Sequence, residues 1–289
     1  MQAILILAHK DVKSVIELSR KLQTCFEIYI HFDTKLSLSS EDKKVLDENQ
    51  LHYFQAIEVN WGAWGISAAT ILLMREALKN PQITYIHVIS GQDWPAKRVE
   101  DIYSFYEGNS NIYMTCDPAR GMKKSGEPII LWQQFYFNYD KVERRTTYGK
   151  IYHRISMAIQ ALLRVNKYKK LDIDMEIYQG ANWMDLPRDA VEYLLNYFDT
   201  HENIRKLFMT GYCPDEFWVQ TILNNSELSG RIIRDYHRYV KWERQHDSYP
   251  AILDERDFEE IVQGDYHFLR KVDRQYSEGL KVKLDKYFY

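Results

Sequence analysis

The chain contains 289 residues, 45% of them hydrophobic and 27% charged, which is typical of a globular protein and excludes a disordered or fibrous one. Its net charge of -3 offers no general basic surface, so we expect no nucleic-acid partner. No apolar run approaches the ~20 residues that cross a bilayer, and residues 3–8 lack the basic flank of a signal peptide, so a cytoplasmic location is expected. The three cysteines are widely spaced and fit reduced thiols better than a metal site.

The first 115 residues alternate apolar runs with amphipathic stretches, which is the pattern of βαβ units. Strands are expected at residues 3–8, 27–32, 52–59 and 84–89, and helices at 12–23 and 67–79. Ser67 is the expected N-cap of the second helix. The alternation predicts an α/β fold with a mostly parallel central sheet flanked by helices.

The second half of the chain is less regular. Residues 116–150 show no clear period and are expected to form long loops. Beyond them we expect one strand at 177–184 and helices at 151–165, 188–198, 214–223, 255–263 and 273–287. No repeat or linker interrupts the sequence. We therefore expect a single domain over 1–289, with a nucleotide-binding part at about 1–115 and an acceptor and catalytic part at about 116–289.

Two of the predicted strands end in polar residues that could form a binding site. His31 and Asp33 lie at the end of the second strand, and Gln92 and Asp93 follow the strand at 84–89. Open α/β sheets bind their ligands beyond the carboxyl ends of the strands. A solvated strand end would produce the same pattern, so each position alone is a weak indication.

A glycine-rich turn at 61–65, Trp-Gly-Ala-Trp-Gly, leads into the predicted helix at 67–79. Its glycines permit close backbone approach, and the start of the helix offers N–H groups to an anion. A tight turn with two core tryptophans is an equally good interpretation. No Walker or dinucleotide-binding fingerprint is present.

An acidic pair, Asp215 and Glu216, opens the predicted helix at 214–223 beside several aromatic residues. Burial among aromatic rings raises a carboxyl pKa and the helix dipole lowers it, so Glu216 could stay ionised yet remain basic enough to accept a proton. The alternative is that both acids merely stabilise the start of the helix.

Two charged segments suggest opposite ways to bind a diphosphate. Arg270 and Lys271 could neutralise a leaving diphosphate without a metal, although such a pair is often a solvated surface. Asp172 and Asp174 form the Asp-x-Asp pattern that many glycosyltransferases use for a metal and diphosphate, but their charged surroundings also fit a solvated loop.

In this order the motifs resemble glycosyltransferase family 14, the core-2/I-branching N-acetylglucosaminyltransferase and peptide O-xylosyltransferase group, particularly its small bacterial members. The resemblance runs nearly end to end and rests on seven segments: ILAHKD at 6–11, IYIHFDTK at 28–35, VNWGAWGISAAT at 59–70, YIHVISGQDWPAK at 85–97, YQGANWMDLPRDAVEYLL at 178–195, YCPDEFWVQTIL at 212–223 and FLRKVD at 268–273.

This resemblance implies a GT-A type fold and a metal-independent, inverting transfer with Glu216 as the catalytic base. The implied donor is a UDP-sugar, with GlcNAc or xylose as its sugar, and the implied acceptor is a hydroxyl of a glycan or lipid-linked oligosaccharide, giving a β linkage. The implied nucleotide-sugar-binding residues are His31, Asp33, Trp64, Gln92, Asp93, Arg270 and Lys271. The implied acceptor-binding residues are Trp94, Trp183, Asp215, Trp218 and Trp242.

The chain departs from the family at one point. An arginine that would accompany Lys271 is missing from 247–249, and Arg244 or Arg270 could replace it. The variable stretch 117–150, which includes Arg144 and Arg145, is expected to shape the acceptor site.

Three alternatives stay open. The enzyme could depend on a metal held by Asp172 and Asp174, or the chain could be an inactive carbohydrate-binding relative. Basic and aromatic residues near 132–170 could also make peripheral contact with the inner membrane face, or they could be an ordinary surface.

Overall fold

The computed structural model of the protein describes residues 1–289 and contains a central seven-stranded sheet with the strand order β12-β6-β11-β4-β1-β2-β3. In chain order its strands are β1 (Gln2–Ala8), β2 (Glu27–Phe32), β3 (His52–Phe54), β4 (Tyr85–Ser90), β6 (Ile112–Met114), β11 (Met184–Pro187) and β12 (Ile232–Ile233). Strands β4, β1, β2 and β3 are parallel, whereas β11 runs antiparallel to both of its neighbours. The predicted mostly parallel α/β sheet is confirmed.

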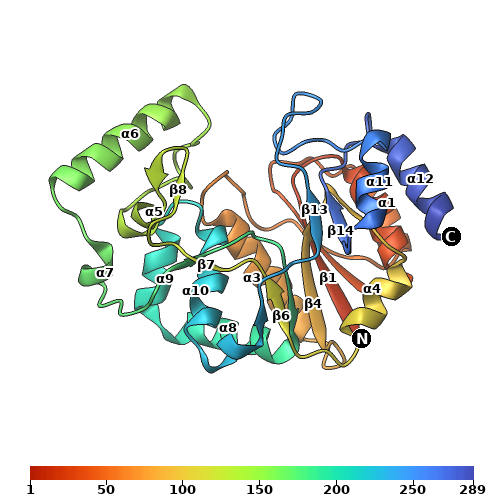
Figure 1. Ribbon diagram of the computed structural model, residues 1–289, viewed down its shortest axis with the longest axis horizontal. Helices are drawn as coiled ribbons and strands as arrows, with labels where there is room; N and C mark the ends of the chain where they lie inside the picture. Colours follow the sequence, from red (N-terminus) through yellow and green to blue (C-terminus); the bar gives the residue numbers. More distant parts are fainter.

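Helices cover both faces of this sheet (Figure 1). One face packs against α3 (Gly65–Leu78), α8 (Arg188–Thr200), α9 (Glu202–Met209) and α10 (Trp218–Asn224). The other packs against α1 (Val12–Leu22), α4 (Val99–Tyr106), α11 (Phe258–Gln263) and α12 (Glu278–Phe288), while α2 (Ser40–Glu48) lies beside α1. Successive side chains of β1 point to opposite faces, so Leu5 enters the first core and Ile4 the second. Burial on both faces explains why β1 reads as a continuous apolar run.

A second, three-stranded sheet lies beside the central one and has the order β13-β14-β5. Its strands are β5 (Asp93–Pro95), β13 (Arg238–Val240) and β14 (Phe268–Arg270). A buried ion pair joins the two sheets, because Arg238 of β13 donates to both carboxylate oxygens of Asp185 on β11, at 2.5 and 2.7 Å. His87 and Tyr106 also hydrogen-bond this carboxylate, each at 2.9 Å. Burial alone would raise the pKa of Asp185, but Arg238 outweighs it and holds the pKa well below its usual range.

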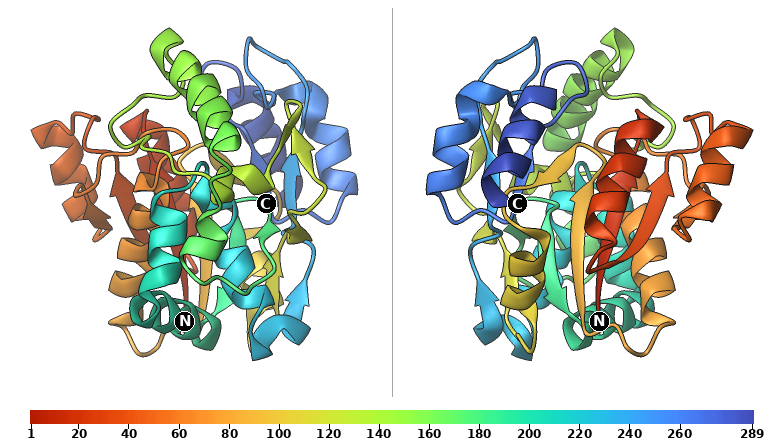
Figure 2. Two further views of the ribbon diagram at one scale, coloured as in Figure 1. Left: turned by 90° about the vertical axis from the view of Figure 1, so that its left-hand side faces the viewer. Right: turned by 90° about the vertical axis from the view of Figure 1, so that its right-hand side faces the viewer.

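Residues 117–170 form small elements, and the helix at 147–162 projects from the body of the protein (Figure 2). Strands β7 (Asp117–Pro118) and β10 (Tyr178–Gln179) pair with each other, and β8 (Lys123–Lys124) forms a hairpin with β9 (Glu127–Pro128). The helices of this region are α5 (Ile130–Gln134), α6 (Thr147–Leu162) and α7 (Lys167–Lys170). None of the protein's helices has the length and hydrophobicity that crossing a bilayer requires.

Two predicted strands are shorter than expected, because acceptors outside the sheet take their backbone N–H groups. The strand expected at 52–59 stops at Phe54: the N–H of Ile57 donates to His31 Nε2, and that of Val59 to the Asp33 carboxylate. The strand expected at 177–184 splits into β10 and β11, since the N–H of Gly180 donates to the carbonyl of Glu216.

Several predicted helix boundaries were also wrong. Ser67 is not an N-cap, because α3 begins at Gly65 and its first N–H groups face the carboxylate of Asp140. The helix expected from residue 273 begins at Glu278, since Asp273 first forms a turn with Ser277. The 214–223 segment is a 3-10 turn, Pro214–Glu216, followed by α10, and 255–263 is likewise a 3-10 turn before α11. The region expected as long loops, 116–150, contains β7, β8, β9, α5 and the start of α6, which ends at Leu162 rather than 165.

We expect Arg238→Ala to lower the free energy of unfolding by about 3–5 kcal/mol, because it leaves the buried Asp185 carboxylate without its charged partner. Urea denaturation measures this directly. Arg75→Ala is the control, since the Arg75–Asp199 pair is half-exposed and should contribute no more than about 1 kcal/mol. Equal losses in the two variants would contradict a special role for the buried pair.

Candidate functional site

The carboxyl edge of the parallel strands forms the floor of the candidate site. The chain proceeds from β1 to β2 and β3 on one side and then returns to place β4 on the other side of β1. Ligands of open α/β sheets bind where the strand order reverses in this way. At this reversal Gly91 packs closely on α1, since a Cβ there would lie 2.7 Å from a methyl group of Val15. The segments that follow β1, β2 and β4 therefore converge on one crevice.

Asp93, which follows β4, positions an arginine. Its buried carboxylate accepts hydrogen bonds from the N–H of Ser90 at 2.8 Å and from Arg270 Nη1, also at 2.8 Å. Arg270 also donates to the hydroxyl of Ser90, and its guanidinium lies 4.3 Å from the ring centre of Trp183. Asp93 is thus committed to Arg270, and the guanidinium is held between a carboxylate and an aromatic ring.

Lys271 lies among other cations. It is half-buried and donates to the hydroxyl of Ser248 at 3.0 Å. Burial lowers its pKa, and Arg270, Lys10 and Arg145 lower it further by repulsion. We refer to Lys10, Arg145, Arg270 and Lys271 as the basic cluster. Repulsion among these cations makes the cluster a suitable place for a polyanion such as a diphosphate.

The basic cluster contains two arginines that can replace the arginine missing from 247–249. Segment 247–249 does reach Lys271, but through Ser248 rather than through an arginine. Arg270 is the neighbour of Lys271 in the chain. Arg145, two residues before α6, also lowers the pKa of Lys271, and it lies 4.9 Å from the ring centre of Trp61. Either guanidinium is better placed than Arg244, which is exposed.

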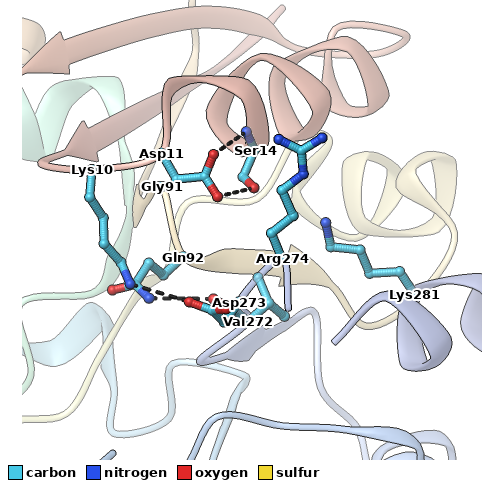
Figure 3. A pocket seen from close by; sticks show the side chains of 9 residues that line it. All are labelled: Lys10, Asp11, Ser14, Gly91, Gln92, Val272, Asp273, Arg274 and Lys281. Atoms are coloured by element: carbon cyan, nitrogen blue, oxygen red, sulfur yellow. Dashed lines mark hydrogen bonds and ion pairs between the residues drawn. The ribbon is translucent and has the colours of Figure 1, made fainter. Parts of the chain in front are cut away.

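A pocket lies beside the basic cluster, between α1 and the segment that precedes α12 (Figure 3). Lys10 and Gln92 belong to its lining, which also contains Asp11, Ser14, Gly91, Val272, Asp273, Arg274 and Lys281. Lys10 forms an ion pair with Asp273 across the pocket at 3.4 Å. Gln92 is anchored by its backbone carbonyl, which accepts from the N–H of Val272 at 2.8 Å.

Glu216 ends the 3-10 turn at Pro214–Glu216, and its carboxylate is 24% exposed. Lys124 Nζ lies 2.9 Å from one carboxylate oxygen, and Gln179 Nε2 donates to it at 3.2 Å. Burial would lower the pKa of Lys124, but the Glu216 carboxylate raises it on balance. Lys124 and Gln179 were not expected from the sequence, because nothing in the β8–β9 hairpin or in β10 indicates which distant residue it will touch.

The neighbouring Asp215 has a different environment. It is buried, and one of its carboxyl oxygens has no hydrogen-bond partner. Burial, together with the negative charge of Glu216, raises the pKa of Asp215 to about 7. A raised pKa favours the neutral form of Asp215, whereas Glu216 is the member of the pair that has a counterion, Lys124.

A short segment connects Glu216 to the basic cluster. Gln179 contacts Glu216 at one end, and Trp183 underlies Arg270 at the other. Four residue steps of extended chain span at most ~14 Å between the Cα atoms of Gln179 and Trp183, so one short segment touches both sites. Gly180 is needed here because a Cβ at this position would lie 1.8 Å from the carbonyl oxygen of Thr115.

Of the other residues expected to bind the nucleotide, His31 and Asp33 are buried. His31 and Asp33 accept backbone N–H groups from 57–59, and Asp33 also faces Lys35 at 3.7 Å. Trp64 is half-buried, with one face stacked on Phe198 at 5.3 Å. Because Asp140 faces the start of α3, this helix end is not the free anion site that the glycine-rich turn had suggested.

The tryptophans expected at the acceptor side divide into two groups. Trp183 is half-buried and Trp242 is largely exposed, packing on Tyr249 at 5.9 Å. Trp94 and Trp218 are core residues with almost no exposed surface, so neither presents a ring face to a sugar. Both expectations were wrong, since each ring fills a hydrophobic cluster that sequence composition does not distinguish from a stacking platform.

Asp172 and Asp174 do not fit a metal site. Both side chains are exposed beyond α7, and no group of three or more His, Cys, Asp or Glu side chains capable of holding a metal occurs in the protein. Two exposed carboxylates without further ligands are too few for a metal that is held by the protein alone.

Two sequence comparisons find glycosyltransferases. The model of the family described as "Branch: Core-2/I-Branching enzyme" matches residues 3–262. The β-glucuronosyltransferase GlcAT14B of Arabidopsis thaliana is 22% identical over 123 residues, which cover 42% of this chain. The same match covers 28% of the plant protein, so the chain spans about a quarter of that relative's length.

Solved glycosyltransferases resemble the structure only distantly. Core-mannan synthase A (CmsA/Ktr4) of Aspergillus fumigatus, in an Mn/GDP form, is 11% identical with a TM-score of 0.38, over 80% of this chain and 72% of that one. A glycosyltransferase involved in glycosylating the major capsid of PBCV-1 is 10% identical with a TM-score of 0.33, over 99% of this chain and 98% of that one. Such scores carry no information about the site. The α/β architecture itself agrees with the expected GT-A type fold.

We expect Gly180→Ala to destabilise the protein by at least about 1–3 kcal/mol, because the new methyl group collides with the backbone of Thr115. Thermal unfolding measures the loss. Gly230→Ala is the matched control, since no atom lies within 4 Å of its added Cβ. A Gly180→Ala variant as stable as the control would show that the segment at 179–183 can move freely.

Proposed function

Because the chain belongs to the Core-2/I-branching enzyme family of glycosyltransferases, we propose that it transfers a sugar from a UDP-sugar to a hydroxyl of a glycan acceptor by a metal-independent, inverting reaction. GlcNAc and xylose remain the leading donor sugars from the motif resemblance. The name of the plant relative adds glucuronic acid to the donors that should be tested. The unpaired state of all three cysteines suits the proposed cytoplasmic location.

One observation carries the proposed mechanism: a partly exposed carboxylate, paired with a lysine, is linked by one short segment to a cluster of cations. Glu216 forms an ion pair with Lys124, while burial raises the pKa of its neighbour Asp215. In the proposed step the acceptor hydroxyl attacks C1 of the donor sugar and passes its proton to Glu216. The bond between C1 and the diphosphate oxygen breaks at the same time, and its electron pair leaves with UDP.

The proposed role of the basic cluster is to stabilise the leaving diphosphate. Lys271 and Arg270 supply fixed positive charge, and Asp93 keeps the guanidinium oriented before the donor arrives. Preorganised cations of this kind can stabilise developing negative charge in a site that lacks a metal. The exposed, isolated arrangement of Asp172 and Asp174 favours this route over the metal-dependent alternative.

We expect Glu216→Gln to lower kcat by at least about 100-fold, because the amide cannot accept the proton of the acceptor hydroxyl. UDP release from a panel of UDP-sugars, with and without EDTA, measures both the donor and the metal dependence. Glu48→Gln, on the exposed face of α2, is the control and should retain full activity.

Two outcomes would contradict the proposal. Activity that EDTA abolishes and manganese restores, together with a loss in Asp172→Asn or Asp174→Asn, would establish the metal-dependent alternative. No turnover with any donor and no UDP binding would identify an inactive carbohydrate-binding relative.

We expect Lys271→Met to weaken UDP binding by about 10- to 100-fold, because a hydrogen bond to a charged group contributes ~1.5–3 kcal/mol. Uridine binding should not change, since uridine lacks the diphosphate. Isothermal titration with both ligands makes the comparison. Lys283→Met, an exposed substitution on α12, serves as the control. Equal weakening of UDP and uridine would place Lys271 away from the diphosphate.

A further inference from the structure

Helix α6 carries an apolar surface that no other part of the protein covers. Its outward side chains recur at helical spacing, and we call them the α6 stripe: Tyr148 is 68% exposed, Ile151 51%, Ile155 54%, Ile159 51% and Leu162 83%. Of the 16 residues in this helix, only Gly149 and His153 are buried. Figure 1 shows α6 at the outer edge of the molecule. A contiguous apolar surface of this kind on a soluble domain indicates a binding partner.

The charge around the α6 stripe has one sign. Residues 144–171 contain eight of the chain's 38 lysines and arginines and none of its 41 acidic residues. Lys150 and Arg154 lie exposed within α6, and Arg164, Lys169 and Lys170 are exposed just beyond it. The remainder of the chain holds 30 basic against 41 acidic residues, so the positive charge is strongly localised.

We propose that α6 docks on an anionic lipid surface, with the α6 stripe inserted at the level of the headgroups and the flanking cations facing lipid phosphates. Leucine, isoleucine and aromatic side chains beside lysine and arginine are the composition of helices that lie in a membrane interface. A nucleic acid would match the charge but not five exposed apolar side chains. A second copy of the chain, paired stripe to stripe, would bring two all-basic segments together.

A membrane bound to α6 would lie beside the part of the site that contains Glu216. From α6, His153 Nε2 is 2.9 Å from the carboxylate of Glu127 on β9. The β8–β9 hairpin pairs Glu127 with Lys124, which holds Glu216. Arg145, immediately before α6, belongs to the basic cluster. Docking itself goes beyond the proposed function and does not depend on it. Its consequence is that a membrane-borne acceptor would meet Glu216 without diffusing away from the lipid surface.

Vesicle co-sedimentation of the full chain, without donor or acceptor, tests the proposal. We expect binding to phosphatidylcholine vesicles containing about 30% phosphatidylglycerol, little binding to pure phosphatidylcholine, and release at high salt. Replacing Ile151, Ile155 and Ile159 by Ser should weaken binding by at least about tenfold. Replacing Lys150, Arg154 and Arg164 by Gln should do so too, and should reduce the salt dependence.

Matched variants separate docking from general surface effects. Met209, Ile233 and Val282 are exposed apolar residues elsewhere, and their replacement by Ser should leave binding unchanged. Lys13, Lys43 and Lys286 serve the same purpose for charge when replaced by Gln. Ile and Ser have similar helix propensities, so circular dichroism should show that α6 survives the substitutions.

Three results would each overturn the proposal. The first is a folded wild type that does not bind anionic vesicles at low salt. The second is vesicle binding by the serine variant of the α6 stripe that equals binding by its control. The third is a dimer in sedimentation equilibrium that dissociates when the α6 stripe is replaced, because the stripe would then be covered by a second copy.

Discussion

The buried contact between Asp185 and Arg238 is the interaction on which the site depends. It joins the central sheet to the three-stranded sheet at a point where both side chains are fully buried. The smaller sheet contains β14, which carries Arg270 and leads directly into Lys271. An unpaired charge at this depth is so unfavourable that the two sheets are held in one relative position. The cations are therefore presented at a defined distance from the carboxyl edge of β1 and β4.

Hydrogen bonds to backbone N–H groups shape the rest of the crevice. His31 and Asp33 take N–H groups from the segment after β3, and this ends the strand and brings residues 57–59 over the sheet edge. The N–H of Gly180 donates to the carbonyl of Glu216, and the missing Cβ of Gly180 permits its close approach to the backbone of Thr115. Irregular backbone near the site thus has specific hydrogen-bond partners, as buried polar groups require.

Side chains of the same charge type lie in different electrostatic environments in the folded protein. Asp215 and Glu216 are neighbours in the chain, but burial raises the pKa of Asp215 while Lys124 pairs with Glu216. For Lys271 the shift has the opposite sign, because burial and neighbouring cations lower its pKa. An anion that binds beside Lys271 therefore stabilises its charged form. These differences arise from position in the folded protein and not from residue identity.

Periodicity and composition alone determined the fold class, because strands that are buried on both faces must be apolar throughout and helices that cover them must be amphipathic. The order of motifs was enough to select Glu216, Arg270 and Lys271 as site candidates, since each lies in a local pattern that the chain displays without folding. Only the tertiary structure revealed the long-range partners Lys124 and Gln179, and only it placed Trp94 and Trp218 in the core. A sequence shows which groups can interact, whereas packing decides which of them are brought together and which lose their access to solvent.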